Sequence, residues 1–492
     1  MGSAEPWNLA AAILAAGILV GIAAMSTRAS RRGPVPLALL FLGVGVLAGS
    51  EAIGGIYLDD HVLAYRIGTV ALILILFDGG LSTRFHRVRM HLTPAITLAT
   101  AGVAATAAIL AVAARLLGLS WNEALLLAAV VSSTDAAAVF SVLRGSGMNL
   151  QQRVSATIEL ESGLNDPMAV ILTAAMVEYA MSGEVSPLAL AWQIPLQLVV
   201  GTLLGIGVGL GCRQVLLRLP PTTMGLLPLV TAASAAIAYG AATLLWGSGF
   251  LAVYVCGLVL GNRSLPDRAG VRRVHDFLAW ASQVVLFLTL GLLVFPSQLI
   301  AIAPVALAIA VALAVVARPL AVALCLVPFR YPAREIAYVG WVGLRGAVPI
   351  VLATYPVLVG VPGAERLFNI IFFVVVVSVV VQAGSVGLAT RIVGLEQAGP
   401  PPPEATLAIT SMQLHEEQVA CYHIDARAAV AGAMIAEVPF PADAAIMMIV
   451  RGPQLVPPRG SVRLEPGDHV YVFCRPEDEA EVALWFGQRI DE

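Results

Sequence analysis

Six charged side chains lie inside long apolar stretches of the sequence, where a charge is costly. They are Asp78, Asp135, Glu161, Asp166, Arg318 and Arg345. A charge in the middle of a membrane helix costs about 2.5–3.5 kcal/mol on insertion scales, so each one is a hypothesis for a functional site. The alternative is that they form buried ion pairs that lock helices together. We favour that alternative for Glu161 with Arg318 and a functional role for Asp166, and for Asp78 we leave both open.

The spacing around Asp166 indicates an ion site. The stretch ELESGLNDPMAV places Glu161 four residues before Asn165 and Ser162 four residues before Asp166. Residues four apart lie on one face of a helix. A carboxylate with a hydroxyl one turn away offers oxygen ligands only, which favours Na⁺ or K⁺ over a transition metal. A carboxylate holds a proton or a cation but not both, and burial favours its protonated form. Competition at Asp166 is therefore a sufficient mechanism for exchange.

Two of the charges lie in segments that are weak helices. SSTDAAAVF has three small polar residues before Asp135, and GWVGLRGAVPI has Gly343, Gly346 and Pro349 around Arg345. Transporters built from inverted repeats form their ion sites from broken helices whose ends face each other. The alternative is that the small residues allow helices to pack closely.

The composition places these residues in a membrane. Hydrophobic residues make up 59% of the 492 and charged residues 12%, whereas a soluble protein has about 25% charged residues. Apolar runs long enough to cross a bilayer recur along the chain. We expect spans at roughly 8–26, 35–50, 62–82, 93–117, 121–143, 154–181, 186–217, 223–246, 249–261, 276–295, 298–328, 334–358 and 366–391.

The connections between these spans predict the orientation. Arginine-rich connections alternate with acidic or short ones, so the positive-inside rule puts the N-terminus outside and the C-terminus in the cytosol. All 28 basic residues are Arg, which excludes a Schiff-base lysine and a Walker-type phosphate lysine. The net charge of −3 suggests no nucleic-acid partner, and the five cysteines have no metal-binding or redox spacing.

The composition changes after Arg391. EQAGPPPPE is typical of a proline-rich linker. Beyond it, segments such as SVRLEPGDHVYVFCRPED alternate apolar and polar residues with Pro-Gly-Asp turns, and EDEAEVALWFGQ is typical of a helix. We therefore expect a membrane domain over 1–393, a linker over 394–404 and a small cytosolic α+β domain over 405–492.

Three motifs in order resemble the signatures of cation:proton antiporter family 1, the sodium/proton and potassium/proton exchangers. They are SSTDAAAVF, ESGLNDPMAV and GLRGAVPI. The resemblance covers nearly the whole chain. It implies a polytopic α-helical protein with 13 transmembrane helices, inverted repeats, a dimerisation region and a moving core. It also implies that broken helices 5 and 12 cross at the ion site.

The resemblance also implies roles for individual residues. Asp166 would carry the ion and the proton, beside Asn165, Ser162, Asp135 and the backbone carbonyl of Thr134. Glu161 would pair with Arg318 on helix 11, Arg345 would lie in the unwound part of helix 12, and Asp78 aligns with an acidic residue on helix 3. An Asn-Asp pair resembles the electroneutral members. Many relatives have Pro where this chain has Ala136, which leaves the unwinding of helix 5 open.

The tail resembles the regulatory TrkA-C (RCK_C) domain of potassium-transport proteins, in the stretch IVRGPQLVPPRGSVRLEPGDHVYVF. That likeness implies K⁺ as substrate and regulation by the tail, and it leaves open a regulatory ligand of the nucleotide type; no cofactor is otherwise expected. Together the resemblances predict an electroneutral K⁺/H⁺ antiporter in the bacterial inner membrane, acting as a homodimer.

Three other functions have to be weighed. Na⁺/H⁺ exchange by the same fold is the nearest one. An intramembrane aspartyl protease would also need two membrane aspartates, but its GxGD signature is missing from the spans, and LHEEQ in the tail lacks the second His of a zinc protease. A channel would need a continuous pore, whereas carboxylate competition implies obligatory exchange.

Overall fold

The structure is a computed structural model, and it describes residues 5–30, 37–146, 148–183, 187–220, 225–397, 419–441, 444–475, 477–487 and 489–490. The chain forms two compact units. The first comprises Met1–Arg218, Gly225–Leu265 and Val271–Gln397, and the second comprises Ala398–Glu492 with two short connecting segments. Residues 398–404 of the expected linker, and the tail as far as residue 418 with LHEEQ in it, lie outside the described residues.

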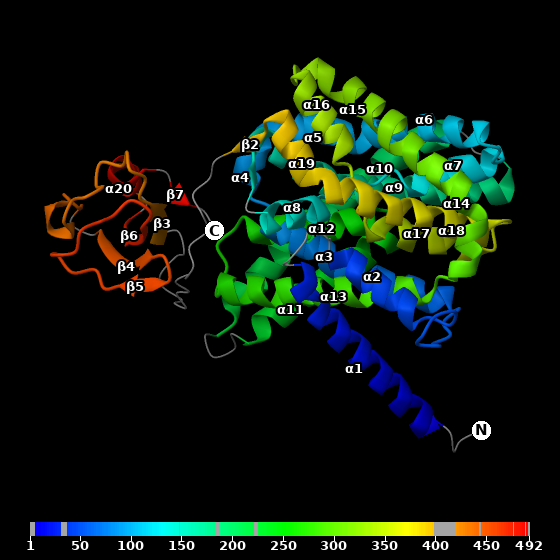
Figure 1. Ribbon diagram of the computed structural model, residues 1–492, viewed down its shortest axis with the longest axis horizontal. Coiled ribbons are helices and arrows are strands. Elements are labelled where there is room, and N and C mark those ends of the chain that lie inside the picture. Colours follow the sequence, from blue (N-terminus) through cyan, green and yellow to red (C-terminus); the bar gives the residue numbers. More distant parts are fainter. Residues whose placement is uncertain are drawn as a thin grey trace. The chain divides into compact units, whose positions relative to one another are not determined.

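The first unit is helical (Figure 1). Its elements are α1 (Glu5–Ser30), α2 (Leu37–Ala48), α3 (His61–Ser82), α4 (Phe85–Val88), η1 (Arg89–His91), α5 (Leu92–Thr97), η2 (Leu98–Gly102), α6 (Val103–Leu116), α7 (Trp121–Val130), α8 (Ala136–Gly145), α9 (Gln152–Ser182), α10 (Pro187–Arg218), α11 (Leu227–Leu244), α12 (Gly249–Gly261), α13 (Arg268–Leu292), α14 (Pro296–Val311), η4 (Ala312–Ala317), α15 (Arg318–Leu326), η5 (Val327–Phe329), α16 (Ala333–Trp341), α17 (Ala347–Val359), α18 (Ala364–Val377), η6 (Ser378–Ala383) and α19 (Gly384–Val393).

Each expected span coincides with one or more of these helices. Among the described residues, seven helices are long and apolar enough to cross a membrane, and five shorter apolar helices accompany them. The count of thirteen crossings stays a prediction. The expected start of the tenth span at residue 276 was wrong, because α13 already begins at Arg268. Its arginines suggested a loop, but they are accommodated on the first turns of a helix whose apolar face is buried.

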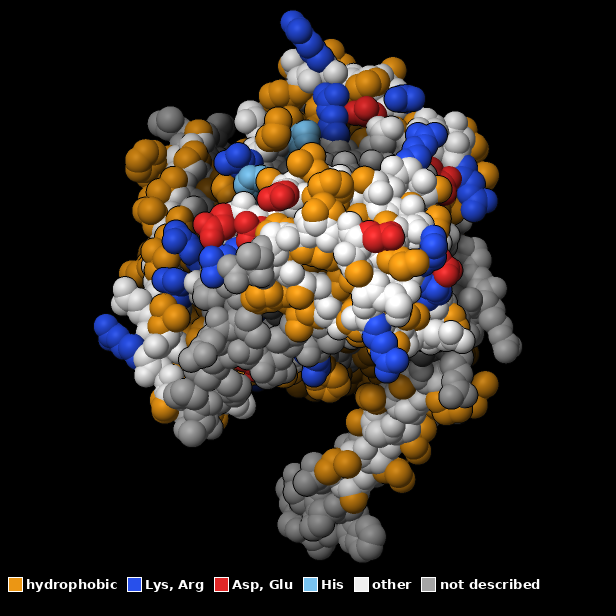
Figure 2. Space-filling model, turned by 90° about the vertical axis from the view of Figure 1, so that its left-hand side faces the viewer, with side chains coloured by type: hydrophobic (Ala, Val, Ile, Leu, Met, Phe, Trp, Pro, Cys, Tyr) orange, Lys and Arg blue, Asp and Glu red, His pale blue; other side chains and the backbone are white. Residues whose placement is uncertain are grey.

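Figure 2 shows one face of the molecule, where apolar side chains lie between scattered arginine and acidic side chains. The interior of the helical unit is apolar, apart from a small set of buried charged and polar side chains. Helix α9 packs against both α7 and α17, among other neighbours, and it carries the ELESGLNDPMAV motif. The motif therefore lies deep within the helical unit.

One short contact in this unit was not expected from the sequence. Strand β1 (Asn149–Leu150), in the connection between α8 and α9, pairs antiparallel with β2 (Glu396–Gln397), which follows α19. The backbone N–H of Gln151 donates to the carbonyl of Leu395 at 3.1 Å and extends the pairing. The end of the first unit is thus joined to the loop between α8, which follows Asp135 directly, and α9, which carries Asp166.

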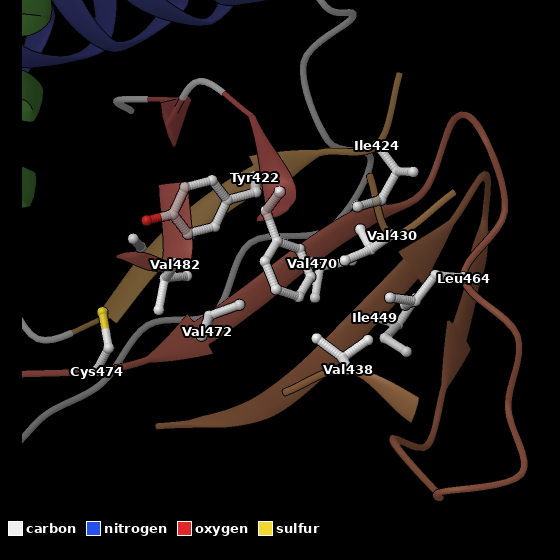
Figure 3. Close-up of a cluster of buried hydrophobic side chains, with 12 residues drawn as sticks. Tyr422, Ile424, Val430, Val438, Ile449, Leu464, Val470, Val472, Cys474 and Val482 are labelled. Atoms are coloured by element: carbon white, nitrogen blue, oxygen red, sulfur yellow. The ribbon is translucent and has the colours of Figure 1, made fainter. Parts of the chain in front are cut away.

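The second unit is the expected α+β domain. It has strands β3 (Val419–His423), β4 (Ala445–Arg451), β5 (Gln454–Val456), β6 (His469–Phe473) and β7 (Arg489–Ile490), with the short helices η8 (Ile435–Glu437) and α20 (Glu479–Phe486). The sheet is antiparallel, in the order β5-β4-β6-β3-β7. Figure 3 shows its core, in which Tyr422, Val470 and Val472 pack with Val482 of α20. The predicted Pro-Gly-Asp turn is present, and Asp468 in it accepts two hydrogen bonds from Arg451 at 2.8 and 2.9 Å.

Candidate ion-binding site

Two helices of the first unit are interrupted at their centres. Residues 131–135 separate α7 from α8, and residues 342–346 separate α16 from α17. The two breaks meet, because the backbone N–H of Asp135 donates to the carbonyl of Leu344 at 2.8 Å. A side chain at Gly346 would collide with the carboxylate of Asp135, so glycine permits this approach. The expectation of two crossed broken helices is confirmed, and helix 5 is broken although Ala136 stands where many relatives have Pro.

Helix α9 holds the first break with two side chains predicted to belong to the site. The hydroxyl of Ser162 donates to the carbonyl of Thr134 and accepts from the backbone N–H of Ala136, both at 3.0 Å. The side-chain amide of Asn165 donates to the hydroxyl of Thr134 at 2.6 Å. The two bonds of Ser162 satisfy backbone groups that the interrupted helix cannot satisfy itself, and the bond of Asn165 fixes the side chain of Thr134.

Asp166 stands beside this arrangement in a cavity of about 800 Å³. Thr134, Asp135, Ser162 and Asp166 all line the cavity, as does Ser133. Asp166 is 8% exposed, and its Oδ1 atom has no hydrogen-bond partner among the described residues. Pro167 follows it inside α9. Because proline has no backbone N–H, Pro167 cannot donate the helical hydrogen bond to the carbonyl of Gly163, four residues earlier.

Asp78 lies on the wall of the same cavity, on α3. Its electrostatic neighbours are Asp276 and Arg272, both on α13. No hydrogen bond connects Asp78 to the first break in the part of the chain that the structure describes. The structure therefore gives Asp78 a place in the cavity, but separates it from the cluster around Thr134.

Glu161 and Arg318 form the ion pair that the sequence led us to expect. Nη1 of Arg318 lies 2.6 Å from Oε1 of Glu161, and Nη2 donates to Oε2 at 2.8 Å. The side chain of Arg318 is 2% exposed and that of Glu161 is 1% exposed. A side chain at Gly343 would lie 2.6 Å from Nε of Arg318, so the pair packs against the second break.

Arg345 lies within the second break and is 1% exposed. Its Nη1 atom donates to the carbonyl of Gly343 at 3.1 Å, and its backbone N–H donates to the hydroxyl of Ser378 at the same distance. Its Nε and Nη2 atoms have no hydrogen-bond partner among the described residues. Arg345 therefore belongs to the frame of the break rather than to the cavity wall.

Several residues that line the cavity from α13 were not predicted from the sequence. Arg272, Asp276 and Gln283 lie on its wall and are spaced by four and seven residues. This is the period of one helical face, and it would have been a usable signal had the helix not been started at residue 276. Glu159 on α9 lines the cavity too and was not singled out.

The comparisons with known proteins agree with this geometry. A model of the sodium/hydrogen exchanger, transmembrane family matches residues 16–391. The chain belongs to this exchanger family. It is therefore a multi-pass membrane transporter, as predicted, and the aspartyl protease alternative is dropped. A TrkA-C domain model matches residues 422–487.

Several curated relatives of this exchanger cover almost its whole length. The K(+)/H(+) antiporter NhaP of Alkalimonas amylolytica is 40% identical over 96% of this chain and 82% of its own. The K(+)/H(+) antiporter NhaP2 of Shewanella sp. (strain ANA-3) is 39% identical over 96% of this chain and 83% of its own. The Na(+)/H(+) antiporter NhaS2 of Synechocystis is 27% identical over 66% of this chain and 62% of its own.

A solved structure supports the fold of the exchanger. The sodium proton antiporter MjNhaP1 of Methanocaldococcus jannaschii superimposes with a TM-score of 0.67 at 22% identity, covering 78% of this chain and 99% of that one.

Proposed function

We propose that this protein exchanges K⁺ for H⁺ across the bacterial inner membrane, without net charge movement, by alternating access. The observation that carries the proposal is the buried Asp166 carboxylate. One of its oxygens has no hydrogen-bond partner in the part of the chain that the structure describes, and it lies in a cavity that Thr134 and Ser162 also line. The choice of K⁺ is supported by relatives about 40% identical that are named K(+)/H(+) antiporters. Na⁺ remains the competing substrate, because the more distant NhaS2 is named a Na(+)/H(+) antiporter.

The mechanism we infer uses competition at one carboxylate. Ionised Asp166 would bind the cation together with hydroxyl and carbonyl oxygens of the first break, and protonated Asp166 would release it. Oxygen ligands without sulfur or imidazole suit an alkali cation. Asn165 would act indirectly, because its amide already donates to Thr134 and so fixes that residue at the site.

The cavity suggests which side of the membrane this state faces. From Asp166 it extends to Asn149, in a connection that the positive-inside rule assigns to the cytosol, and to Arg272, in the arginine-rich first turns of α13. We infer an inward-facing state, with the N-terminus outside and the C-terminus in the cytosol. Alternating access then requires the core to move, so that the carboxylate reaches the other side.

Everted membrane vesicles with a fluorescent pH probe test the function. K⁺, Na⁺, Rb⁺ and Li⁺ are added in turn, and proton movement is recorded. We expect a saturable response, largest with K⁺, that falls in Asp166→Asn to the background of vesicles from cells that lack the exchanger. Asp59→Asn, in the outer connection before α3, serves as the matched control with wild-type flux. A larger response to Na⁺ than to K⁺, or normal exchange by Asp166→Asn, contradicts the proposal.

We propose further that the exchanger is a homodimer, because a moving core needs a fixed part against which to move. The exposed apolar side chains of α10, such as Trp192 and Leu203, are consistent with contact to lipid or to a second copy. Native mass measurement in a lipid nanodisc would give twice the chain mass. A monomer that exchanges at the wild-type rate would contradict this.

We also propose that the cytosolic tail controls the exchange rate. The connection to the tail leaves the first unit directly after β2, which is hydrogen-bonded to the loop between α8 and α9. Asp135 directly precedes α8, and Asp166 lies near the centre of α9. A movement of the connection to the tail would therefore be transmitted to the site through β2 and the loop between α8 and α9. A ligand of the tail, such as a nucleotide, could act only by changing how strongly the tail favours one state of the core.

Two truncations of the full chain distinguish the effect of the tail from the effect of β2. Ending the chain before Gly399 keeps β2, and ending it before Leu395 removes β2 as well. We expect the first to change the rate or the pH dependence of exchange but not the order of cations. The second would in addition loosen the loop at β1. Unchanged kinetics at every pH in the first truncation would contradict control by the tail.

A further inference from the structure

Among the described residues, the side chains that hydrogen-bond to the second break come from the last membrane helix and not from α9, which carries Asp166. Interrupting the helix between Trp341 and Ala347 leaves backbone groups without helical partners. The carbonyl of Trp341 accepts from Nε2 of Gln382 at 2.9 Å. The backbone N–H of Arg345 donates to the hydroxyl of Ser378 at 3.1 Å. Two side chains from one segment therefore hold both ends of the break.

These two side chains are also bonded to each other. The hydroxyl of Ser378 donates to Oε1 of Gln382 at 2.5 Å, so its lone pair is free to accept from Arg345 and the amide of Gln382 must turn its Nε2 toward Trp341. The result is a series of three hydrogen bonds that runs from Arg345 through Ser378 and Gln382 to Trp341, so it links the two ends of the break. Ser385 reinforces it, because its hydroxyl accepts from the indole of Trp341 and donates to the carbonyl of Gln382.

The backbone around this series of hydrogen bonds is unusual. Ser378 and Gln382 lie in η6, a π-helical segment that interrupts the otherwise α-helical course of α18 and α19. Such segments are rare and are frequently found at functional sites. Both side chains are 5% exposed in a run that is otherwise valine-rich. In a membrane, polar side chains of this kind mainly form hydrogen bonds between helices.

The position of the break matters for the ion site because of what touches it. Asp135 donates its backbone N–H to Leu344, and its carboxylate lies against Gly346. A shift of residues 342–346 would therefore move Asp135, which lines the cavity together with Asp166.

We propose that Ser378 and Gln382 form a clamp that positions the second break for ion exchange. They act through the break on Asp135 and do not touch the ion. The inference rests on the exchange function proposed above and assigns positioning residues for it on a helix that carries none of the predicted ligands.

The test compares Gln382→Leu and Ser378→Ala with Asn369→Leu in the full-length protein. Asn369 lies on α18, is 8% exposed and donates to Gln298 of α14 at 2.8 Å. This hydrogen bond also joins two helices but does not involve residues 342–346, so Asn369→Leu is the matched control. We expect Gln382→Leu and Ser378→Ala to raise the half-saturating K⁺ concentration on the order of 10-fold, the low end for residues that support metal ligands. Ser378→Thr, which keeps the hydroxyl, should retain wild-type kinetics, and so should Asn369→Leu.

A second readout does not depend on transport. Amide hydrogen exchange in peptides that contain residues 342–347 should become faster in Ser378→Ala and stay unchanged in Asn369→Leu. If Gln382→Leu and Ser378→Ala keep the wild-type K⁺ dependence, or if Asn369→Leu alters it to the same extent, the clamp has no positioning role and the bonds merely join helices. Loss of exchange in the wild-type protein itself would instead overturn the proposed function.

Discussion

The two helix breaks have the same backbone problem and solve it with different partners. The first, at residues 131–135, is held by Ser162 and Asn165 of α9, beside the carboxylate of Asp166. The second, at residues 342–346, is held by Ser378 and Gln382 of the last membrane helix. The oxygens that hold the first break are those that a cation in the cavity would contact. The side-chain atoms that hold the second break make their hydrogen bonds within the protein and are not offered to a cation.

This difference assigns different tasks to the two breaks. A bound cation would have to share or replace hydrogen bonds of the first break, so that break can respond to the ion. The second break keeps its bonds whatever occupies the cavity and presents a fixed edge to Asp135. The crossing therefore combines one side that can change with one side that stays in place.

The largest effect is expected from the ion pair that touches both regions. Glu161 precedes Ser162 on α9, and its partner Arg318 packs against Gly343 of the second break. Removing one partner of a buried pair leaves the other charge uncompensated and costs about 3–5 kcal/mol. Glu161→Gln and Arg318→Met should each lower the melting temperature of the purified protein more than Asp166→Asn does.

Two controls sharpen this prediction. Replacing both partners with methionine should recover much of the loss, because a matched apolar pair leaves no unpaired charge. Arg366 lies 3.8 Å from Glu123 near the surface, and Arg366→Met should cost no more than about 1 kcal/mol, as exposed pairs do. Single replacements of Glu161 and Arg318 that melt like the wild type would show that the pair does not stabilise the crossing.

A smaller effect is expected from a methyl group in the second break. In Gly343→Ala the new carbon would lie 2.6 Å from Nε of Arg318, and the fully buried guanidinium has little room to move. Overpacking of this kind costs about 1–3 kcal/mol. Gly207→Ala on α10, where the added carbon meets nothing within 4 Å, is the matched control and should be neutral or stabilising. Equal melting temperatures for the two variants would mean that the second break is not rigid.

The sequence predicted the partners of the first break but not those of the second, for a physical reason. Membrane charges are costly, so Asp135, Asp166, Glu161 and Arg318 could be identified from residue type alone. The partners of the first break were found because Ser162 lies one turn from Asp166 on the same helix. No local period relates Arg345 to Ser378, 33 residues away, and an uncharged Ser or Gln in a valine-rich run gives no comparable warning.

The same limit applies to the rest of the fold. Apolar length and arginine distribution indicated where the helices lie, and alternation indicated the strands of the tail. The β1–β2 pairing joins two-residue segments that are separated by more than 240 positions, so nothing in either segment predicts it. The polar residues of α13 that line the cavity were missed because arginines in its first turns were taken as evidence for a loop.

The smallest predicted effect separates the two breaks directly. In the wild-type protein, K⁺ in the cavity should slow amide hydrogen exchange in peptides that contain residues 132–138, because the ion would tie together the carbonyl of Thr134 and the hydroxyl of Ser162. Peptides that contain residues 342–347 should exchange equally fast with and without K⁺. Because a single hydrogen bond contributes about 0.5–1.5 kcal/mol, the change at the first break should be roughly 2- to 12-fold. Asp166→Asn should lose the response at the first break, while Ser378→Ala should speed exchange at the second break to the same degree in both conditions. Choline chloride at the same concentration controls for ionic strength. A K⁺ response of equal size at both breaks would mean that the crossing moves as one piece, and the division into a responsive side and a fixed side would have to be abandoned.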